Sequence, residues 1–565
     1  MNGNGVELFN LDNYSVSIID SDTTGYSGLS WEKEGNAFSF LKEVSDTAYI
    51  EKNHIVFSVR DIYSAIKVEK FDPLSSPAIP EGLRIRETYT PVYSKDMSIL
   101  YFGVYEWNRA PKKGKKKETE KLPGVDIWHW KDEPVQPRQV VEYDRGEKDF
   151  TYLYAWNINL KKAVRITDET FREGTITGDG MNVIIRTDKP YAPAFRLSRY
   201  DHFLVDSKTG ERREIIKDFT NLYGSSPGGK YVVYFKDLNW FVYDIQAGTH
   251  RNLTSSIPTE LWNTRDDGPE VVKPPFGSAG WFKEDESILV YDEFDVWRVP
   301  VTGGRPVKLT SGRENGIIYR VARLDREEDF FKPGEPLYLT MQGDKTKLSG
   351  YSRVTAQGKI EELIYEDAAL SSLSKARDAQ LFAFRMEDYD NSPDIFVTTD
   401  KFKKPDQVSS TNPQMDNYFW GKSELIDFTS RTGEKLQGAL YYPANYDPSK
   451  KYPMIVYIYE ILSTGVHRYS SPSLTSAYNT TNYTTDGYFV FQPDIVYQTN
   501  HPGESAVNCV VPAVEEVIST GMIDEESIGL VGHSWGAYQT SFIITGPIFL
   551  PRLLQGSADR HDKYV

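Results

Sequence analysis

The segment Gly532-His533-Ser534-Trp535-Gly536 matches G-x-S-x-G, a pattern that can place a serine at the apex of a sharp turn. A chain of this length contains the pattern by chance about one time in five, so the five residues alone carry little weight. Their surroundings strengthen the prediction, because an apolar strand precedes them and the helical sequence QTSFII follows. We predict an exposed nucleophilic serine, with glycines for close backbone passage and a helix start that supplies N–H groups. The alternative is a tight turn in which the serine has no catalytic role.

The elements around this serine follow the pattern of an α/β domain. Residues 423–460 predict two short strands, a polar loop and then the continuous apolar strand Met454–Tyr459. A second apolar run lies in 485–497, an amphipathic helix in 504–521, and another strand in 527–534. Continuous apolar strands that alternate with amphipathic helices indicate a parallel sheet buried on both faces.

Most of the chain before this domain is a repeat of several strands, with a period of about 40–50 residues. The clearest copies are 225–254 and 280–310, and weaker copies start at Tyr93 and Ala376. A signature of Asp, then Ile or Val, then Trp or Phe occurs at 126–128, 295–297 and 394–396. This periodicity is typical of propeller blades, and residues from roughly 15 to 412 have room for seven or eight of them.

The fold class predicted from these patterns is an all-β propeller over 1–413, followed over 414–565 by an α/β-hydrolase domain that is incomplete at its C-terminus. A propeller by itself is as suitable for a scaffold or interaction platform as for an enzyme, because a fold does not assign chemistry.

Composition narrows the classes of function. The net charge of −16 and pI near 5.2 argue against nucleic-acid binding, which needs a basic face. The lysine-rich run 111–118 is expected to be a solvated hairpin insertion inside one blade, with a nucleic-acid or anionic-surface contact as the alternative. Cys509 is the single cysteine, so no internal disulfide framework is expected, and no apolar run is long enough to predict a membrane span.

The sequence also has no motif for a metal, nucleotide or dinucleotide site, so we expect no cofactor and no metal. The first residues show no signal-peptide pattern. We expect a soluble protein. The sequence leaves its oligomeric state and cellular compartment open, with a periplasmic or secreted parent protein as one alternative.

The repeat-built first domain, followed by YYPANYDPSKKYPMIVYIY and GHSWGAY, resembles the prolyl oligopeptidase family of serine peptidases. The dipeptidyl-peptidase and acylaminoacyl-peptidase branches are the most similar, and the resemblance is specific from Lys451 to Tyr538. It implies that Ser534 attacks a peptide carbonyl and that the Trp535 N–H and the Tyr459 hydroxyl hold the oxyanion. Tyr457, two residues earlier within the strand, is the competing candidate for the hydroxyl.

Two departures from the family pattern lie close to these residues. The glycine-rich turn that follows the tyrosine in the family is Glu460-Ile461-Leu462 here, so we expect a different loop shape. The elbow ends in Gly536-Ala537 where the family commonly has two glycines.

The larger departure concerns the catalytic triad, whose order on this fold is Ser, then Asp, then His on later strands. We expect the triad Asp and His to be missing from the chain, and a serine without its base is a poor nucleophile at neutral pH. His533, at the variable position of the elbow, should point away from the serine hydroxyl. The other histidines and acids weighed as partners are His467, His501, Asp559, His561 and Asp562.

The last twenty or so residues raise a further expectation. The sequence from Gly546 to Val565 lacks the strand–helix rhythm of the domain. Pro547–Gly556, read one nucleotide earlier with suitable codons, resembles the segment that follows the nucleophile helix in the family. We therefore expect a frameshifted and prematurely ended hydrolase.

Three functions are consistent with the sequence. The leading hypothesis is a serine peptidase that cleaves short peptides through an acyl-enzyme, with access restricted by the propeller. The second is a propeller binding protein with a non-catalytic α/β remnant. The third is an esterase or other acyl hydrolase, since the serine chemistry does not choose the leaving group.

Overall fold

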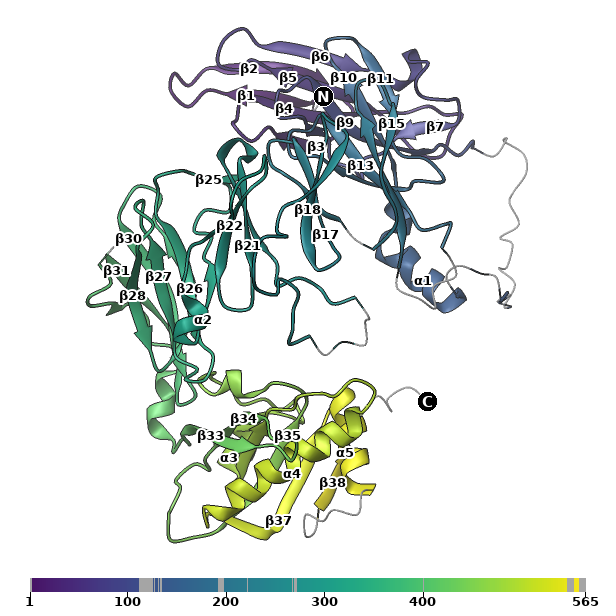
Figure 1. Cartoon of the computed structure of the whole chain (residues 1–565). Helices are drawn as coiled ribbons and strands as arrows, with labels where there is room; N and C mark the ends of the chain where they lie inside the picture. Colours follow the sequence, from purple (N-terminus) through teal and green to yellow (C-terminus); the bar gives the residue numbers. More distant parts are fainter. Residues whose placement is uncertain are drawn as a thin grey trace. The chain divides into compact units, whose positions relative to one another are not determined.

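The computed structural model describes residues 3–110, 135–191, 198–220, 222–266, 272–399 and 401–545, together with Val125, Trp128–Trp130, Asp132, Gly268 and the backbone of 553–557. The chain forms two compact units. The first comprises 1–255, 284–286 and 301–303, and the second comprises 256–283, 287–300 and 304–565. In the described part, most of the structure is β-sheet and helices are few (Figure 1).

The first unit consists of antiparallel sheets whose strands follow one another along the chain. Apart from the pair β1–β2, each of its described sheets has four or five strands, formed by β3–β6, β7–β11, β12–β15 and β16–β19. The elements are β1 (Asn4–Phe9), β2 (Val16–Asp22), β3 (Tyr26–Trp31), β4 (Ala37–Val44), β5 (Asn53–Arg60), β6 (Lys67–Phe71), β7 (Leu83–Ile85), β8 (Val92–Tyr93), β9 (Ile99–Glu106), α1 (Gln136–Arg145), β10 (Tyr152–Asn157), β11 (Lys162–Arg165), β12 (Glu173–Ile176), β13 (Asn182–Thr187), β14 (Tyr200–Asp206), β15 (Arg212–Phe219), β16 (Leu222–Ser225), β17 (Tyr231–Lys236), β18 (Asn239–Asp244) and β19 (Thr249–Asn252).

The second unit contains three further sheets, antiparallel except that β25 pairs in parallel with β20, and then a six-stranded sheet. The first three have the strand orders β23-β22-β21-β20-β25, β24-β26-β27-β28 and β29-β30-β31-β32. Their elements are β20 (Ser278–Phe282), β21 (Ser287–Tyr291), β22 (Val296–Pro300), β23 (Val307–Lys308), α2 (Gly312–Asn315), β24 (Ile317–Val321), β25 (Phe330–Phe331), β26 (Leu337–Gly343), β27 (Ser349–Val354), β28 (Ile360–Glu366), β29 (Ala369–Lys375), β30 (Leu381–Asp388), β31 (Asn391–Thr399) and β32 (Asp406–Gln407).

The repeat seen in the sequence corresponds to these sheets, and three of them share one side-chain clasp. In each of these sheets, an Asp or Asn lies in the third strand or just before it. The side-chain oxygen of this residue accepts a hydrogen bond from the hydroxyl of a Thr or Ser that lies fifteen residues later in the chain. The same hydroxyl accepts the N–H of the residue after that acid or amide. The donor and acceptor pairs are Thr254 and Asn239 (3.1 Å), Thr310 and Asp295 (2.6 Å), and Ser409 and Asp394 (2.7 Å). The clasp explains why Thr or Ser recurs near the end of these three copies.

The copy that starts at Tyr93 differs from the prediction. Strand β9 pairs with β10, whose Trp156 is buried, whereas Trp128 lies outside any strand and is largely exposed. The run YLYAWN of β10 offers more apolar surface to the sheet than the signature segment does, and burial decides the pairing. Asp126, Ile127 and the lysine-rich run 111–118 lie outside the described residues.

The six-stranded sheet has the order β33-β34-β36-β35-β37-β38, in which β36, β35, β37 and β38 are parallel. The predicted parallel sheet is confirmed for these four strands. Strands β33 and β34 add an antiparallel edge to it, because the short turn that joins them permits only antiparallel pairing. The elements are β33 (Ser423–Thr429), β34 (Lys435–Tyr441), β35 (Tyr452–Ile458), α3 (Thr480–Thr485), β36 (Phe489–Pro493), α4 (Pro502–Ser519), β37 (Ile523–Gly532), α5 (Trp535–Thr545) and β38 (Leu553–Ser557).

Strand β38 also departs from the expectation that the sequence after Gly546 has no strand–helix rhythm. Its backbone pairs in parallel with β37, from Leu553 beside Ile528 to Ser557 beside Gly532. The edge of β37 would otherwise present unpaired N–H and C=O groups, and an extended segment satisfies them with little demand on its side chains.

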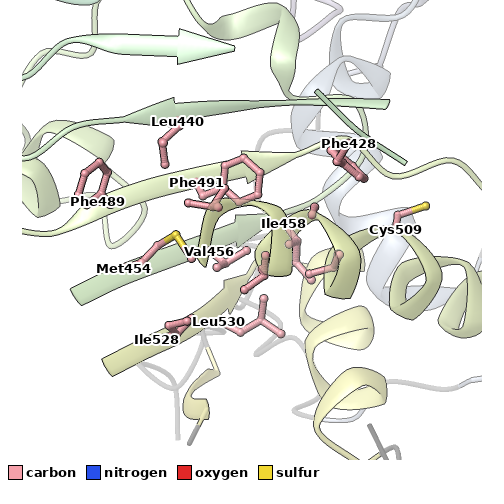
Figure 2. Packing of buried hydrophobic residues seen from close by; sticks show 14 of the residues in the cluster. Phe428, Leu440, Met454, Val456, Ile458, Phe489, Phe491, Cys509, Ile528 and Leu530 are labelled. Carbon is pink, nitrogen blue, oxygen red and sulfur yellow. The ribbon is translucent and has the colours of Figure 1, made fainter. Parts of the chain in front are cut away.

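Both faces of the central strands are covered. On one face, Met454, Val456 and Ile458 of β35 pack with residues of α4, including the buried Cys509, as Figure 2 shows. The other face has a separate cluster that includes Tyr441 of β34. Alternate residues of β35 thus point into two apolar layers, as expected for a strand buried on both sides.

Candidate active site

Ser534 lies between the end of β37 at Gly532 and the start of α5 at Trp535, which confirms the predicted strand–turn–helix setting. Its side chain is exposed, and its backbone has a φ of 51°. A non-glycine residue in the left-handed region is strained, and such strain is concentrated at functional sites. The turn therefore holds the serine outward at a conformational cost.

The two glycines of the motif are required by close backbone approach. A Cβ at Gly532 would lie 2.2 Å from the carbonyl oxygen of Gly536, and a Cβ at Gly536 would lie 2.4 Å from that of Ile458. Real Cβ atoms do not approach backbone oxygens so closely. The prediction that these glycines allow two backbone segments to pass each other is confirmed.

Trp535 begins α5, so its N–H is one of the helix-start donors that have no partner inside the helix. Within the described ranges, this N–H donates to no other group, while the next three N–H groups bond to His533 and Ser534 carbonyls. A free donor beside the serine is suited to hold a developing negative charge. Its role as an oxyanion donor remains a prediction.

Tyr459 follows directly after β35, and Ile458, the last residue of β35, pairs with Gly532. The Cδ2 atom of its ring lies 3.6 Å from the place where a Cβ on Gly536 would be. Tyr459 is therefore beside the elbow. The competing Tyr457 lies inside β35, where its ring packs on Tyr478 at 5.6 Å and burial raises the pKa of its hydroxyl.

His533 is exposed, and its Nδ1 lies 3.4 Å from the Tyr478 hydroxyl. The ring is thus engaged with the aromatic side chain of Tyr478 (centroids 5.4 Å apart), in line with the expectation that it points away from the serine.

The other two described histidines near the site in sequence pair with acids. His467 lies between Asp367 and Asp388, at 3.1 and 3.2 Å, and His501 contacts Glu504 at 3.3 Å. In the part of the chain that the structure describes, no histidine is hydrogen-bonded to the Ser534 hydroxyl. Asp559, His561 and Asp562 lie outside that part.

Sequence reasoning missed three residues that contact the site. Asp494 and Tyr497 follow β36 at the same edge of the sheet as Tyr459, and Gln539 is fully buried in α5. The signal that could have identified the first two is their position directly after an apolar strand, where ligand-binding residues of open α/β sheets occur.

Across the described ranges, no three His, Cys, Asp or Glu side chains gather closely enough to hold a metal ion. The described helices are all too short or too polar to serve as membrane-crossing segments.

No protein-family model matches the sequence, and a search of curated proteins finds no significant match. Solved structures do match. The crystal structure of dipeptidyl peptidase 4 from Porphyromonas gingivalis matches with a TM-score of 0.53 at 11% sequence identity, over 95% of this chain and 77% of that chain. The chain has the fold of dipeptidyl peptidase 4.

A second structure with the dipeptidyl peptidase 4 fold supports this assignment. A candidate dipeptidyl aminopeptidase IV from Bacteroides ovatus ATCC 8483 matches with a TM-score of 0.50 at 15% identity, over 89% of this chain and 71% of that chain. At these identities the two matches show a shared fold, and this is the fold expected from the resemblance to dipeptidyl peptidases.

Proposed function

We propose that this chain is a serine peptidase of the prolyl oligopeptidase type that hydrolyses short peptides through an acyl-enzyme at Ser534. The observation that carries the proposal is the elbow, where a strained, exposed serine stands between two glycines at which an added Cβ would clash with backbone oxygens. The Trp535 N–H and the Tyr459 hydroxyl act as the oxyanion donors. The fold shared with dipeptidyl peptidase 4 supports peptides as the substrate class.

In this proposal the chain has two domains, a β-propeller over 1–413 and an α/β-hydrolase domain over 414–565. The seven described sheets of four or five strands, formed mostly by strands that are consecutive in the chain and antiparallel apart from the pair β20–β25, support the propeller. The propeller restricts access to short or unfolded substrates. Cleavage of short peptides, with no cleavage of a folded protein that contains the same sequence, is the expected result.

Among the described residues, no general base lies against Ser534. Our proposal therefore includes that the Asp and His of the catalytic triad are not among the described residues. Removing the base of a triad leaves only the residual catalysis of the oxyanion hole and binding, roughly 10³–10⁴-fold over water. The chain is thus expected to react slowly with peptides and faster with activated esters. This observation also favours the second candidate, a binding protein whose α/β domain is not catalytic.

Labelling with a fluorophosphonate separates the two candidates. The enzyme proposal predicts covalent labelling that is abolished by Ser534→Ala and retained by Ser476→Ala, a matched change of an exposed serine. It also predicts release of p-nitroaniline from aminoacyl anilides that depends on Ser534. Absence of both labelling and turnover would refute the peptidase and support the binding protein, whereas turnover of esters alone would support an esterase.

A further inference from the structure

The residues that follow β36 contact the backbone on both sides of Tyr459. Strands β35 and β36 are parallel neighbours, so their carboxyl ends lie at the same edge of the sheet. Tyr459 follows the last residue of β35, and Asp494 follows the last residue of β36. We call residues 494–497 the β36 extension.

Asp494 fixes the turn that comes after Tyr459. Its Oδ1 accepts the N–H groups of Leu462 and Ser463, both at 2.8 Å, and its Oδ2 accepts the Ser463 hydroxyl at 2.6 Å. The N–H of Ile495 donates to the Glu460 carbonyl at 2.9 Å. Because Asp494 and Ser463 are both buried, these bonds are shielded from water and hold one conformation of the turn.

The charge environment of Asp494 matches this role. Burial raises the pKa of its carboxyl group, while the hydrogen bonds from Ser463 and the nearby Lys347 ammonium oppose that rise. Lys347 is itself buried, and the two side chains line the same cavity of about 200 Å³. The turn after Tyr459 is therefore tied to a carboxylate with a cation near it.

Tyr497 fixes Tyr459 itself. Its hydroxyl donates to the Tyr459 carbonyl oxygen at 2.7 Å and accepts a hydrogen bond from the Gln539 amide. Gln539 is fully buried in α5, the helix that starts directly after Ser534. A continuous path of hydrogen bonds thus runs from the nucleophile helix to the tyrosine.

We infer that Asp494 and Tyr497 are positioning residues, which set the Tyr459 hydroxyl relative to Ser534 without touching the reacting atoms. The inference rests on the proposed function. An oxyanion donor must lie 2.7–3.1 Å from the charge, and a displacement of about 1 Å costs roughly 100-fold in rate. The loop here has Glu460-Ile461-Leu462 after the tyrosine, and the β36 extension is what makes this loop rigid.

The test uses the full chain and the second-order rate constant for fluorophosphonate labelling of Ser534. Tyr497→Phe and Asp494→Asn each keep the size of the side chain and are expected to slow labelling by roughly 10-fold to 100-fold. In a Tyr459→Phe background the same changes should have little further effect, because the group that they position is already gone.

Matched controls lie at the opposite end of β35. The Tyr452 hydroxyl accepts the Asp447 N–H at 2.9 Å, and Asp447 Oδ1 accepts the N–H and hydroxyl of Ser449 at 2.9 and 2.7 Å. Tyr452→Phe and Asp447→Asn therefore remove bonds between the same kinds of group at the far edge of the sheet, where Asp447 is more exposed to solvent than Asp494. Both should leave the labelling rate unchanged.

Hydrogen exchange of the backbone amides gives a readout that is independent of the labelling reaction at Ser534. Asp494→Asn should speed hydrogen exchange at the Leu462 and Ser463 amides, while the amides of the sheet stay protected. If this variant does not fold, the labelling rate of Tyr497→Phe decides alone. Labelling that is insensitive to the substitutions, or effects that persist in full in the Tyr459→Phe background, would overturn this inference and leave the proposed function intact. No labelling of the unsubstituted chain would overturn the proposed function and the inference together.

Discussion

Gly536→Ala is the sharpest steric test of the elbow. The new Cβ would lie 2.4 Å from the Ile458 carbonyl oxygen, whereas carbon and oxygen atoms in contact are separated by about 3.3 Å. Either the start of α5 or the end of β35 must therefore move by about 1 Å. That movement separates Ser534 from Tyr459, and a displacement of this size costs roughly 100-fold in rate. Forcing the extra methyl group into the turn should also cost about 1–3 kcal/mol of stability.

The assay is the burst of p-nitrophenolate that accompanies acylation by p-nitrophenyl acetate, measured beside thermal unfolding. Gly465→Ala is the matched control, because its Cβ would meet only the Tyr441 hydroxyl, at an ordinary 3.8 Å. The control should acylate at the unsubstituted rate. If Gly536→Ala acylates within twofold of the unsubstituted chain, the close contact is not what positions the serine, and the steric reasoning is wrong.

Three further predictions concern other parts of the molecule. Tyr459→Phe should slow acylation by roughly 10²–10³, the usual loss for one oxyanion donor, and an unchanged rate would point to Tyr457 or a backbone group. Asp295→Ala should destabilise the second unit by about 3 kcal/mol in urea unfolding, because the buried Thr310 hydroxyl and Gly312 N–H lose their acceptor; a loss below about 0.5 kcal/mol would show that the clasp is dispensable. Burial lowers the pKa of His202 to about 4, so the unfolded chain binds more protons between about pH 4 and 6.5, and stability should fall as the pH is lowered through that window, by at most about 3 kcal/mol. His202→Phe should flatten that dependence, and a variant with the same pH profile would assign the loss to other groups.

The elbow was predictable because its determinants are local. The apolar strand, the two glycines and the helical sequence all lie within about twenty residues. The close approach of another backbone segment at Gly532 favours glycine at that position, and this is visible in the sequence. The repeat was recognisable for the same reason, although its clasps were not predicted: Thr310 and Asp295, which form one of them, are only fifteen residues apart. Tyr459 was found through the family resemblance.

The contacts made by the β36 extension were not predictable from the sequence alone. Tyr497 reaches Tyr459 across 38 residues, and Asp494 reaches Ser463 across 31. Both contacts exist because β36 pairs with β35, and strand order is set by the packing of the whole sheet and not by any local pattern. The partner of β9 was mispredicted because β10, which lies far along the chain, offers more apolar surface than the signature segment does.

The most direct test of the central claim is the structure of the chain after reaction with a phosphonate. The phosphorus should be bonded to the Ser534 hydroxyl oxygen, with the phosphoryl oxygen 2.7–3.1 Å from both the Trp535 N–H nitrogen and the Tyr459 hydroxyl oxygen. An adduct at another residue, or a phosphoryl oxygen that faces solvent away from both donors, would contradict the assignment of this elbow as the catalytic centre.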